Sequence, residues 1–236
     1  MNRKSKIGVV GILLLSIMIP AISAFAVITT PPSQQIQQVG SADVLSKLSA
    51  EWWQWVLSIP TSENPMLDTT GQNCSVGQRG NIWFLVGIFQ SGTITRTCSV
   101  PQGKQLFFPV INYVNISAPG IGGQGPENYL VKDMRKDTAA YINNATNLSV
   151  ILDGKKIKKI DHIKSDVFEV SLTADNVFGV PAGIYSPAVD EGFYVMLGPL
   201  DVGTHTLHIH SENPDVAPAF SLDVTYNLNV VPVFLH

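Results

Sequence analysis

Residues 147–163 read NLSVILDGKKIKKIDHI, and this stretch decides the fold class. Two strand-like segments, 148–152 and 156–163, flank the dipeptide Asp153-Gly154. An Asp-Gly pair between two such segments is typical of a β-hairpin with a type I′ turn. We therefore expect an antiparallel hairpin here, and the chain from Asn147 onward shows strand patterns only.

Strand patterns also precede this stretch, and two helical segments interrupt them. Apolar residues recur at three- and four-residue steps within 41–59, where Ser41 is a plausible N-cap. Residues 127–145 show a second helical spacing. This order predicts a mainly β protein, a β-sandwich of jelly-roll or immunoglobulin-like type with two helices in the N-terminal half. The other strands are expected at 81–87, 93–100, 105–111, 167–172, 193–197, 204–210 and 221–231.

The N-terminal residues 1–26 have the layout of a secretory signal peptide. A basic head at residues 3–6 precedes an apolar run at 7–19. Ala24-Phe25-Ala26 then supplies the small residues that signal peptidase needs. The layout predicts a secreted or extracytoplasmic protein.

Two further expectations follow for the region after the basic head. If the signal is not cut, the uncharged stretch 7–28 is long enough to span a bilayer as an anchor. Residues 27–40 are rich in Pro, Gln, Thr and Ser, which predicts a flexible linker. We expect residues 41–236 to form a single domain, outside the cytoplasm whether or not the signal is cut.

The chain carries little charge, with 14% Asp, Glu, Lys and Arg against about 25% in typical soluble domains. Its formal net charge is −3. Removal of the signal, which holds three of the 15 basic residues and no acidic one, makes it −6. An acidic product disfavours nucleic acid and anionic membranes as partners. We expect no nucleic acid, and no membrane contact beyond the export signal or an uncleaved N-terminal anchor.

A long polar loop at residues 60–80 contains Cys74 and Asp68. Cys98 is the second of only two cysteines, and a lone pair in an exported chain is most simply one disulfide. A redox pair or a thiolate metal site would need other cysteine spacings or more ligands. Asp68 is expected to cap the loop by accepting hydrogen bonds from nearby backbone N–H groups.

Three histidines lie in the predicted strand 204–210. Alternation along a strand places His208 and His210 on one face and His205 on the other. A His-x-His pair can supply two imidazoles to zinc, copper or iron, so a divalent transition metal is the one cofactor we consider. The alternative is that these are ordinary half-exposed strand residues. The candidates for a third ligand are Glu212, Asp215 and His162.

The tryptophans suggest a binding hypothesis, because exposed indole rings stack on sugars. Trp52, Trp55 and Trp83 fall in apolar patterns and are expected in the core. Trp53 lies on the flank of the helical stripe and is the one expected to face solvent and bind a ligand.

Several Asn-x-Ser/Thr triplets could carry glycans in a suitable host. Asn115, Asn144 and Asn147 are the candidate glycosylation sites, whereas Asn73 stands next to Cys74 and would be crowded.

A set of motifs follows in one order: WWxW at 52–55, NPxxDxxGxxC at 64–74, GQ at 77–78, WFL at 83–85, CxVPxGK at 98–104, FPVxN at 108–112 and LGPLxxGTHT at 197–206. This set resembles a family of secreted prokaryotic proteins of unknown function, over most of residues 45–231. The resemblance implies the limits of the domain. It also fits a disulfide between Cys74 in the loop 60–80 and Cys98 in the predicted strand 93–100. It carries no activity.

We expect an exported, non-enzymatic surface or extracellular protein that binds a glycan, a polymer or a cell-surface protein. One alternative is a metal-dependent hydrolase or oxidase centred on His208 and His210. Another is a structural component of the cell envelope. An enzyme would show ionisable residues converging in one cleft, and a glycan binder would show solvent-facing aromatic rings beside amide side chains.

Overall fold

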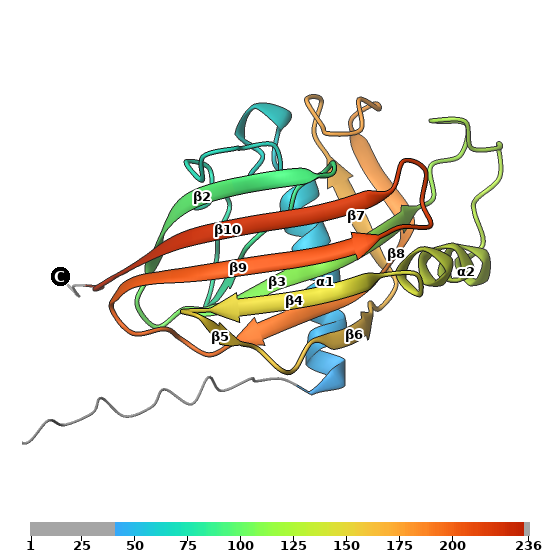
Figure 1. Ribbon diagram of the computed structural model, residues 1–236. Helices are drawn as coiled ribbons and strands as arrows, with labels where there is room; N and C mark the ends of the chain where they lie inside the picture. Colours follow the sequence, from blue (N-terminus) through green and yellow to red (C-terminus); the bar gives the residue numbers. More distant parts are fainter. Residues whose placement is uncertain (1–40, 234–236) are drawn as a thin grey trace, which may run out of the picture. The chain divides into compact units, whose positions relative to one another are not determined.

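Residues 41–233, the part of the chain that the computed structural model describes, contain two mixed β-sheets, two α-helices and a short 3-10 helix, η1 (Thr61–Glu63) (Figure 1). The first sheet has the strand order β1-β3-β8-β6, with β7 also paired to β8. The second sheet has the order β2-β10-β9-β4-β5. The strands are β1 (Ile82–Phe84), β2 (Gly92–Pro101), β3 (Gln105–Ile116), β4 (Thr146–Leu152), β5 (Lys155–Lys156), β6 (Asp161–Lys164), β7 (Phe168–Leu172), β8 (Gly183–Leu197), β9 (Gly203–Asn213) and β10 (Phe220–Val231).

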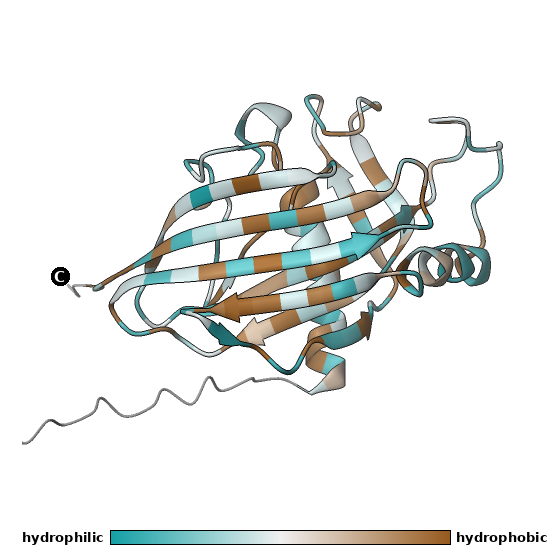
Figure 2. Ribbon diagram, viewed as in Figure 1, coloured by the Kyte–Doolittle hydropathy of each residue, from teal (hydrophilic) through white to brown (hydrophobic). Residues whose placement is uncertain are grey.

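The two sheets face each other across one apolar cluster. Along β9 and β10 buried and half-buried residues alternate, as expected for strands with one face in a core. Hydrophobic and more polar residues alternate along the same strands (Figure 2). The pairing of β10 with β2 is parallel and that with β9 is antiparallel, so the second sheet is mixed. The inner cluster includes Phe108 of β3, Val195 of β8, Ile209 of β9 and Val224 of β10.

Helix α1 (Ala42–Leu57) covers the other face of the first sheet. Its apolar stripe packs on strands β3, β6, β7 and β8 in a second cluster, which includes Trp52, Phe107 and Tyr194. The helix confirms the predicted segment 41–59 apart from its ends. Ser41 precedes it, but its side chain makes no capping hydrogen bond.

Helix α2 (Val131–Ile142) is shorter than the predicted segment 127–145 and lies just past the middle of the chain. It buries Met134, Thr138 and Ile142, which are four residues apart and so form one stripe. The helix contacts β8 and β3.

The predicted hairpin is confirmed, but its second arm was assigned too long. Ile151 and Leu152 of β4 pair with Lys156 and Lys155 of β5. The turn residues Asp153 and Gly154 have φ of 49° and 75°, as a type I′ turn requires. Only two residues form β5, whose exposed lysines occupy the edge of the second sheet.

The chain then crosses to the first sheet, so the predicted strand 156–163 is wrong as one element. Ile157 belongs to the cluster between the sheets, whereas Ile163 of β6 belongs to the cluster under α1. In a single strand, residues 157 and 163 would lie on the same face of one sheet, because their separation is an even number of residues. The two isoleucines are instead buried in different clusters.

Strand β8 is much longer than the predicted segment 193–197. Its first part carries Asp190, Glu191 and Gly192, which interrupt the apolar pattern that the prediction relied on. All three nevertheless lie in the sheet, paired with Val114, Tyr113 and Asn112 of β3.

All described residues belong to one compact unit. The predicted signal peptide 1–26 and linker 27–40 lie outside the described residues. Within residues 41–233, no helix is long and apolar enough to cross a membrane.

Candidate functional site

A cavity of about 330 Å³ lies along one edge of β3. This volume falls in the range of small-molecule sites, which are mostly apolar with a few placed polar groups. Residues from three kinds of element line the cavity. They come from the helices α1 and α2, from the strands β3 and β10, and from two loops, one before β2 and one between β7 and β8. Its lining residues are Trp52, Trp53, Met66, Gly87, Ile88, Phe89, Pro109, Val110, Ile111, Asn112, Tyr113, Val114, Tyr141, Phe178, Phe220 and Leu222.

The edge of β3 is open there because β1 is short. β1 pairs with β3 only from Gln105 to Phe107. Beyond this point a bulge between Pro109 and Ile111 shifts the register of β3 against β8. A bulge adds one residue to a strand and so reverses which side chains face each side of the sheet. Asn112 thereby comes to the α1 side of the sheet.

Aromatic rings form the rim of the cavity. Phe89, Tyr113 and Phe178 are 45%, 37% and 38% exposed and line the same cavity, and exposed apolar residues that lie together often mark a binding surface. The rings of Phe89 and Phe178 lie 6.2 Å apart, and Tyr113 stacks on Tyr141 at 4.6 Å. Solvent-facing aromatic rings beside the amide of Asn112 are the combination expected of a glycan binder.

A buried hydrogen-bond network holds two lining residues in place. The Trp53 indole N–H donates to Asp190 Oδ1 at 2.7 Å, and the Tyr194 hydroxyl donates to Asp190 Oδ2 at 2.8 Å. The Asn112 side-chain amide donates to the same hydroxyl at 2.9 Å. Asp190 therefore fixes the indole directly and the amide through Tyr194.

Gly192 makes this geometry possible. It pairs with Asn112 across the two strands. A Cβ on residue 192 would lie 2.6 Å from the Asn112 Cβ and 2.8 Å from the Tyr194 ring, closer than such atoms approach. Only glycine leaves room for both side chains to meet.

The Asp190 carboxyl is fully buried, and this burial raises its pKa to about 7. Hydrogen bonds from Trp53 and Tyr194 favour the ionised form and limit the rise, as does the positive charge of Arg135. A carboxyl that titrates near neutrality and bonds to a residue lining a cavity is a feature of many functional sites.

Glu191 points to the opposite side of the sheet, toward α2, and is also fully buried. Its carboxylate lies 2.8 Å from His162 Nε2 and 3.6 Å from Lys164 Nζ. The Thr138 hydroxyl donates to it at 3.4 Å. Neither acid is among the site residues predicted from the sequence, although two consecutive carboxylates at 190–191 within an otherwise apolar stretch could have indicated them.

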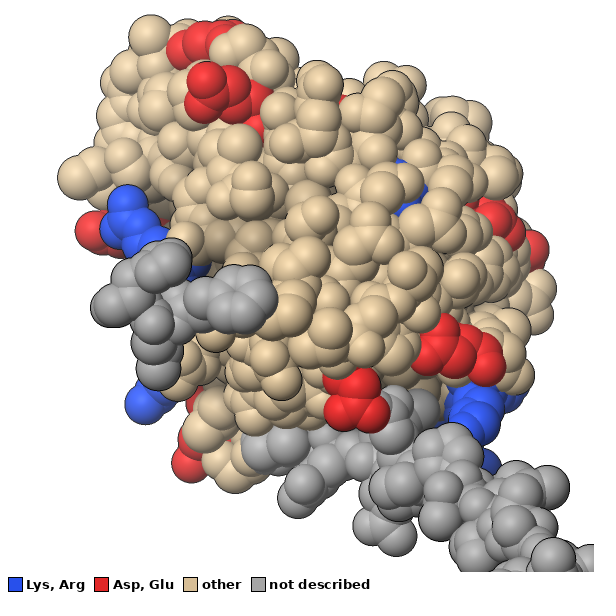
Figure 3. Space-filling model, turned by 90° about the vertical axis from the view of Figure 1, so that its left-hand side faces the viewer, with Lys and Arg blue, Asp and Glu red and all other residues tan. Residues whose placement is uncertain are grey.

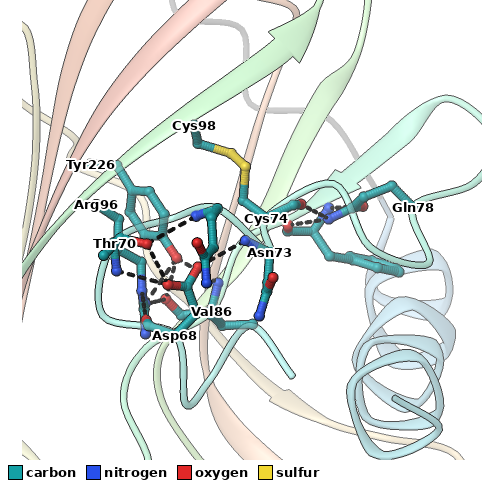
Figure 4. The surroundings of a disulfide bond; sticks show 11 residues. Asp68, Thr70, Asn73, Cys74, Gln78, Val86, Arg96, Cys98 and Tyr226 are labelled. Atoms are coloured by element: carbon teal, nitrogen blue, oxygen red, sulfur yellow. Dashed lines mark hydrogen bonds between the residues drawn. A yellow bond between two sulfur atoms is a disulfide. The ribbon is translucent and has the colours of Figure 1, made fainter. Parts of the chain in front are cut away.

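Arg96, a buried arginine (Figure 4), bonds to the backbone of Met66 and Gly87, two residues that line the cavity. The Arg96 guanidinium is 1% exposed and donates to the carbonyls of Asp68, Val86, Gly87 and Met66. It also donates to the Tyr226 hydroxyl at 3.1 Å. One side chain thus joins the loop 60–80 to the segment before β2.

The predicted disulfide is present between Cys74 and Cys98, and it ties the same loop to β2 (Figure 4). Asp68 caps the loop as expected, accepting from the N–H groups of Thr70 at 2.8 Å and Asn73 at 2.9 Å. The loop that carries Met66 is therefore held covalently and by hydrogen bonds.

Trp53 does not face bulk solvent, and this expectation was wrong. The residue is only 6% exposed, because its indole reaches back to Asp190 on β8. It does line the cavity, together with Trp52. Its role as a ligand-binding residue stays a prediction. A ligand would contact Trp53 inside the cavity and not on an open surface.

The histidines lie elsewhere, on the outer face of the second sheet. His208 and His210 share that face, as predicted, and both contact Asp223 of β10, at 2.9 and 3.3 Å. The hydrogen bond from His208 lowers the pKa of Asp223. Glu212 lies 3.3 Å from His210, but His162 belongs to the first sheet and Asp215 is exposed in the loop before β10. Among residues 41–233, no group of three or more His, Cys, Asp or Glu side chains is arranged to hold a metal ion.

The candidate glycosylation sites differ in exposure. Asn144 and Asn147 are exposed, and Asn115 is half-buried. The Asn147 amide donates to Glu212 at 2.6 Å, and that of Asn115 to Asp137 at 3.4 Å. Glycosylation at these residues stays a prediction.

No charged side chain is among the described residues that line the cavity. Charge is also sparse on the face of the molecule shown in Figure 3, where acidic and basic side chains lie scattered among uncharged ones. An uncharged lining favours an uncharged ligand, because a charged group entering it would lose its hydration without gaining a partner.

Comparison of the chain with family models, with curated proteins and with solved structures finds no match.

Proposed function

We propose that this chain is an exported, non-enzymatic binding protein, and that an uncharged ligand with an apolar face occupies the cavity along β3. The observation that carries the proposal is the combination of an aromatic rim, a fixed amide and a lining without charged side chains. Ring faces bury the apolar side of such a ligand. The amide of Asn112 offers it one hydrogen-bonding group.

Export rests on two features. Residues 1–26 carry the signal layout, and the Cys74–Cys98 disulfide is compatible with an oxidising compartment. In this proposal the fold is a β-sandwich with an added helix layer. Its parallel pairs, β1 with β3 and β2 with β10, set it apart from the antiparallel sheets of jelly-roll and immunoglobulin domains.

A pair of fluorescent compounds tests the ligand class. N-phenyl-naphthylamine is a neutral aromatic compound, and anilinonaphthalene sulfonate has the same rings with an added negative charge. The full chain should bind the neutral compound with rising fluorescence and bind the sulfonate about tenfold more weakly or not at all. The proposal would be overturned if the chain bound both compounds equally well, or if it bound neither of them.

Two variants locate the binding. Phe178→Ala removes a ring of the rim and should weaken binding of the neutral compound about tenfold. Ile184→Ala removes a side chain that is 69% exposed and lies outside the cavity, and it should leave binding unchanged. Equal effects of both variants would show that the compound binds another surface.

A further inference from the structure

One side of the cavity is the edge of a β-strand. We call residues 111–116 of β3 the open edge. β1 ends opposite Phe107, and among the described residues no strand lies beyond it on that side of β3. An unpaired edge presents backbone N–H and C=O groups that can pair with another chain.

The hydrogen bonds of Asp190 reveal which groups point outward. The Ser165 N–H donates to the Asp190 carbonyl at 3.0 Å, and the Asp190 N–H donates to the Ser165 hydroxyl at 2.8 Å. The backbone of Asp190 thus points away from β3. Val114 pairs with Asp190, so by the alternation of an antiparallel ladder its own N–H and C=O point away from β8. The same holds two residues away, at Asn112 and Ile116.

Gln124 already uses this edge in the manner of a neighbouring strand. Its side-chain amide donates to the Ile116 carbonyl at 2.7 Å and accepts from the Ala118 N–H at 2.7 Å. The amide therefore closes the far end of the open edge. The outward backbone groups of Asn112 and Val114 remain between this cap and the end of β1.

A second cavity, of about 250 Å³, continues along the same edge. It shares Tyr113, Val114 and Phe178 with the first, and no charged side chain is among the described residues that line it. The first cavity flanks residues 109–114 of the chain and the second flanks 113–118. The lining residues of the second cavity are Tyr113, Val114, Asn115, Ile116, Ala118, Ile121, Gly122, Gln124, Leu172, Phe178, Val180 and Tyr185.

We propose that the open edge binds an extended, uncharged polypeptide segment of a partner protein, which adds to the first sheet as a short strand. Main-chain hydrogen bonds to Asn112 and Val114 give affinity, and apolar side chains of the segment enter the two cavities. A segment of about five residues spans about 17 Å, a length suited to the open edge. The inference rests on the proposed function and names its ligand class.

A polypeptide suits this surface better than a glycan does. Donors and acceptors of the edge repeat at the spacing of a peptide backbone, which a sugar chain does not reproduce. The side-chain N–H of Asn112 already donates to Tyr194, so this residue offers mainly its amide oxygen, whereas a sugar chain presents many hydroxyl groups.

A proline variant tests the edge directly. The full chain is screened against a soluble library of blocked hexapeptides that contain only uncharged residues. Val114→Pro removes an N–H that makes no bond to β8, and proline is tolerated at sheet edges. It should weaken binding of the selected peptides about tenfold relative to Val114→Ala, which keeps the N–H. Equal affinity of the two variants would overturn the proposal.

N-methylated copies of the best peptide give a second readout, which holds even if Val114→Pro fails to fold. Methylation at alternate positions should abolish binding, and methylation at the positions between them should be tolerated. A uniform response would contradict strand addition. Chitohexaose, an uncharged sugar chain, is tested beside the peptides. If it binds, if Phe178→Ala weakens its binding, and if no library peptide binds, the binding function stands and this inference falls. If no ligand of either kind binds, this inference falls, and the neutral fluorescent compound alone decides the proposed function.

Discussion

The Trp53 indole N–H donates to the Asp190 carboxylate at 2.7 Å, although 137 residues separate the two in the chain. The bond joins α1 to the central strand β8 beneath the cavity. Because the indole lines the cavity, a fully buried acid holds one of the lining side chains in place.

Asp190→Asn should change how stability depends on pH. The pKa of Asp190 is raised from 3.8 to about 7, so the folded state holds its proton more tightly than the unfolded state. The stabilisation is complete below the unfolded-state pKa and is lost as pH rises through 7. Between about pH 5 and about pH 8 the wild type should lose about 3 kcal/mol relative to Asp190→Asn.

Urea unfolding of both proteins across this range measures the difference. Glu169→Gln, at an exposed acid of β7, serves as the control and should run parallel to the wild type. Parallel curves for Asp190→Asn as well would contradict the assignment of a raised pKa to this residue.

Arg96→Met should be strongly destabilising, by about 3 kcal/mol or more. The substitution leaves several buried carbonyls on two segments without their donor, and methionine supplies none. Arg79→Met, at an exposed arginine, should cost less than about 0.5 kcal/mol. Chemical denaturation compares them, and a similar small loss in both would show that Arg96 does not hold the cavity wall.

Gly192→Ala should lower stability and weaken ligand binding together. The new methyl group would press on Asn112 and Tyr194, at a cost of about 1–3 kcal/mol for overpacking. Gly125→Ala is the matched control, because a Cβ there meets open space. A variant at 192 with unchanged stability and binding would show that the two strands separate easily at this point.

Local signals in the sequence predicted local structure well. Asp153-Gly154 fixes the hairpin because the turn needs only its own residues, and the stripe of α1 reports its burial directly. The disulfide could be predicted because the chain has only two cysteines and its N-terminal residues are predicted to be an export signal.

Features that depend on distant partners could not be predicted in the same way. Asp190 is tolerated inside β8 because Trp53 and Tyr194 satisfy it, and neither bond is visible in a hydropathy pattern. The bulge of β3, which turns Asn112 toward Tyr194, likewise depends on the neighbouring strand. The burial of Trp53 was misjudged for this reason.

The most direct test of the central claim is to follow the nuclear magnetic resonance spectrum of the labelled chain as the neutral N-phenyl-naphthylamine is added. We predict that the Trp53 indole N–H and the Asn112 side-chain amide shift progressively, while the signals of His208 and His210 on the outer face stay in place. Shifts confined to other residues, or no shifts at all, would contradict a binding site along β3.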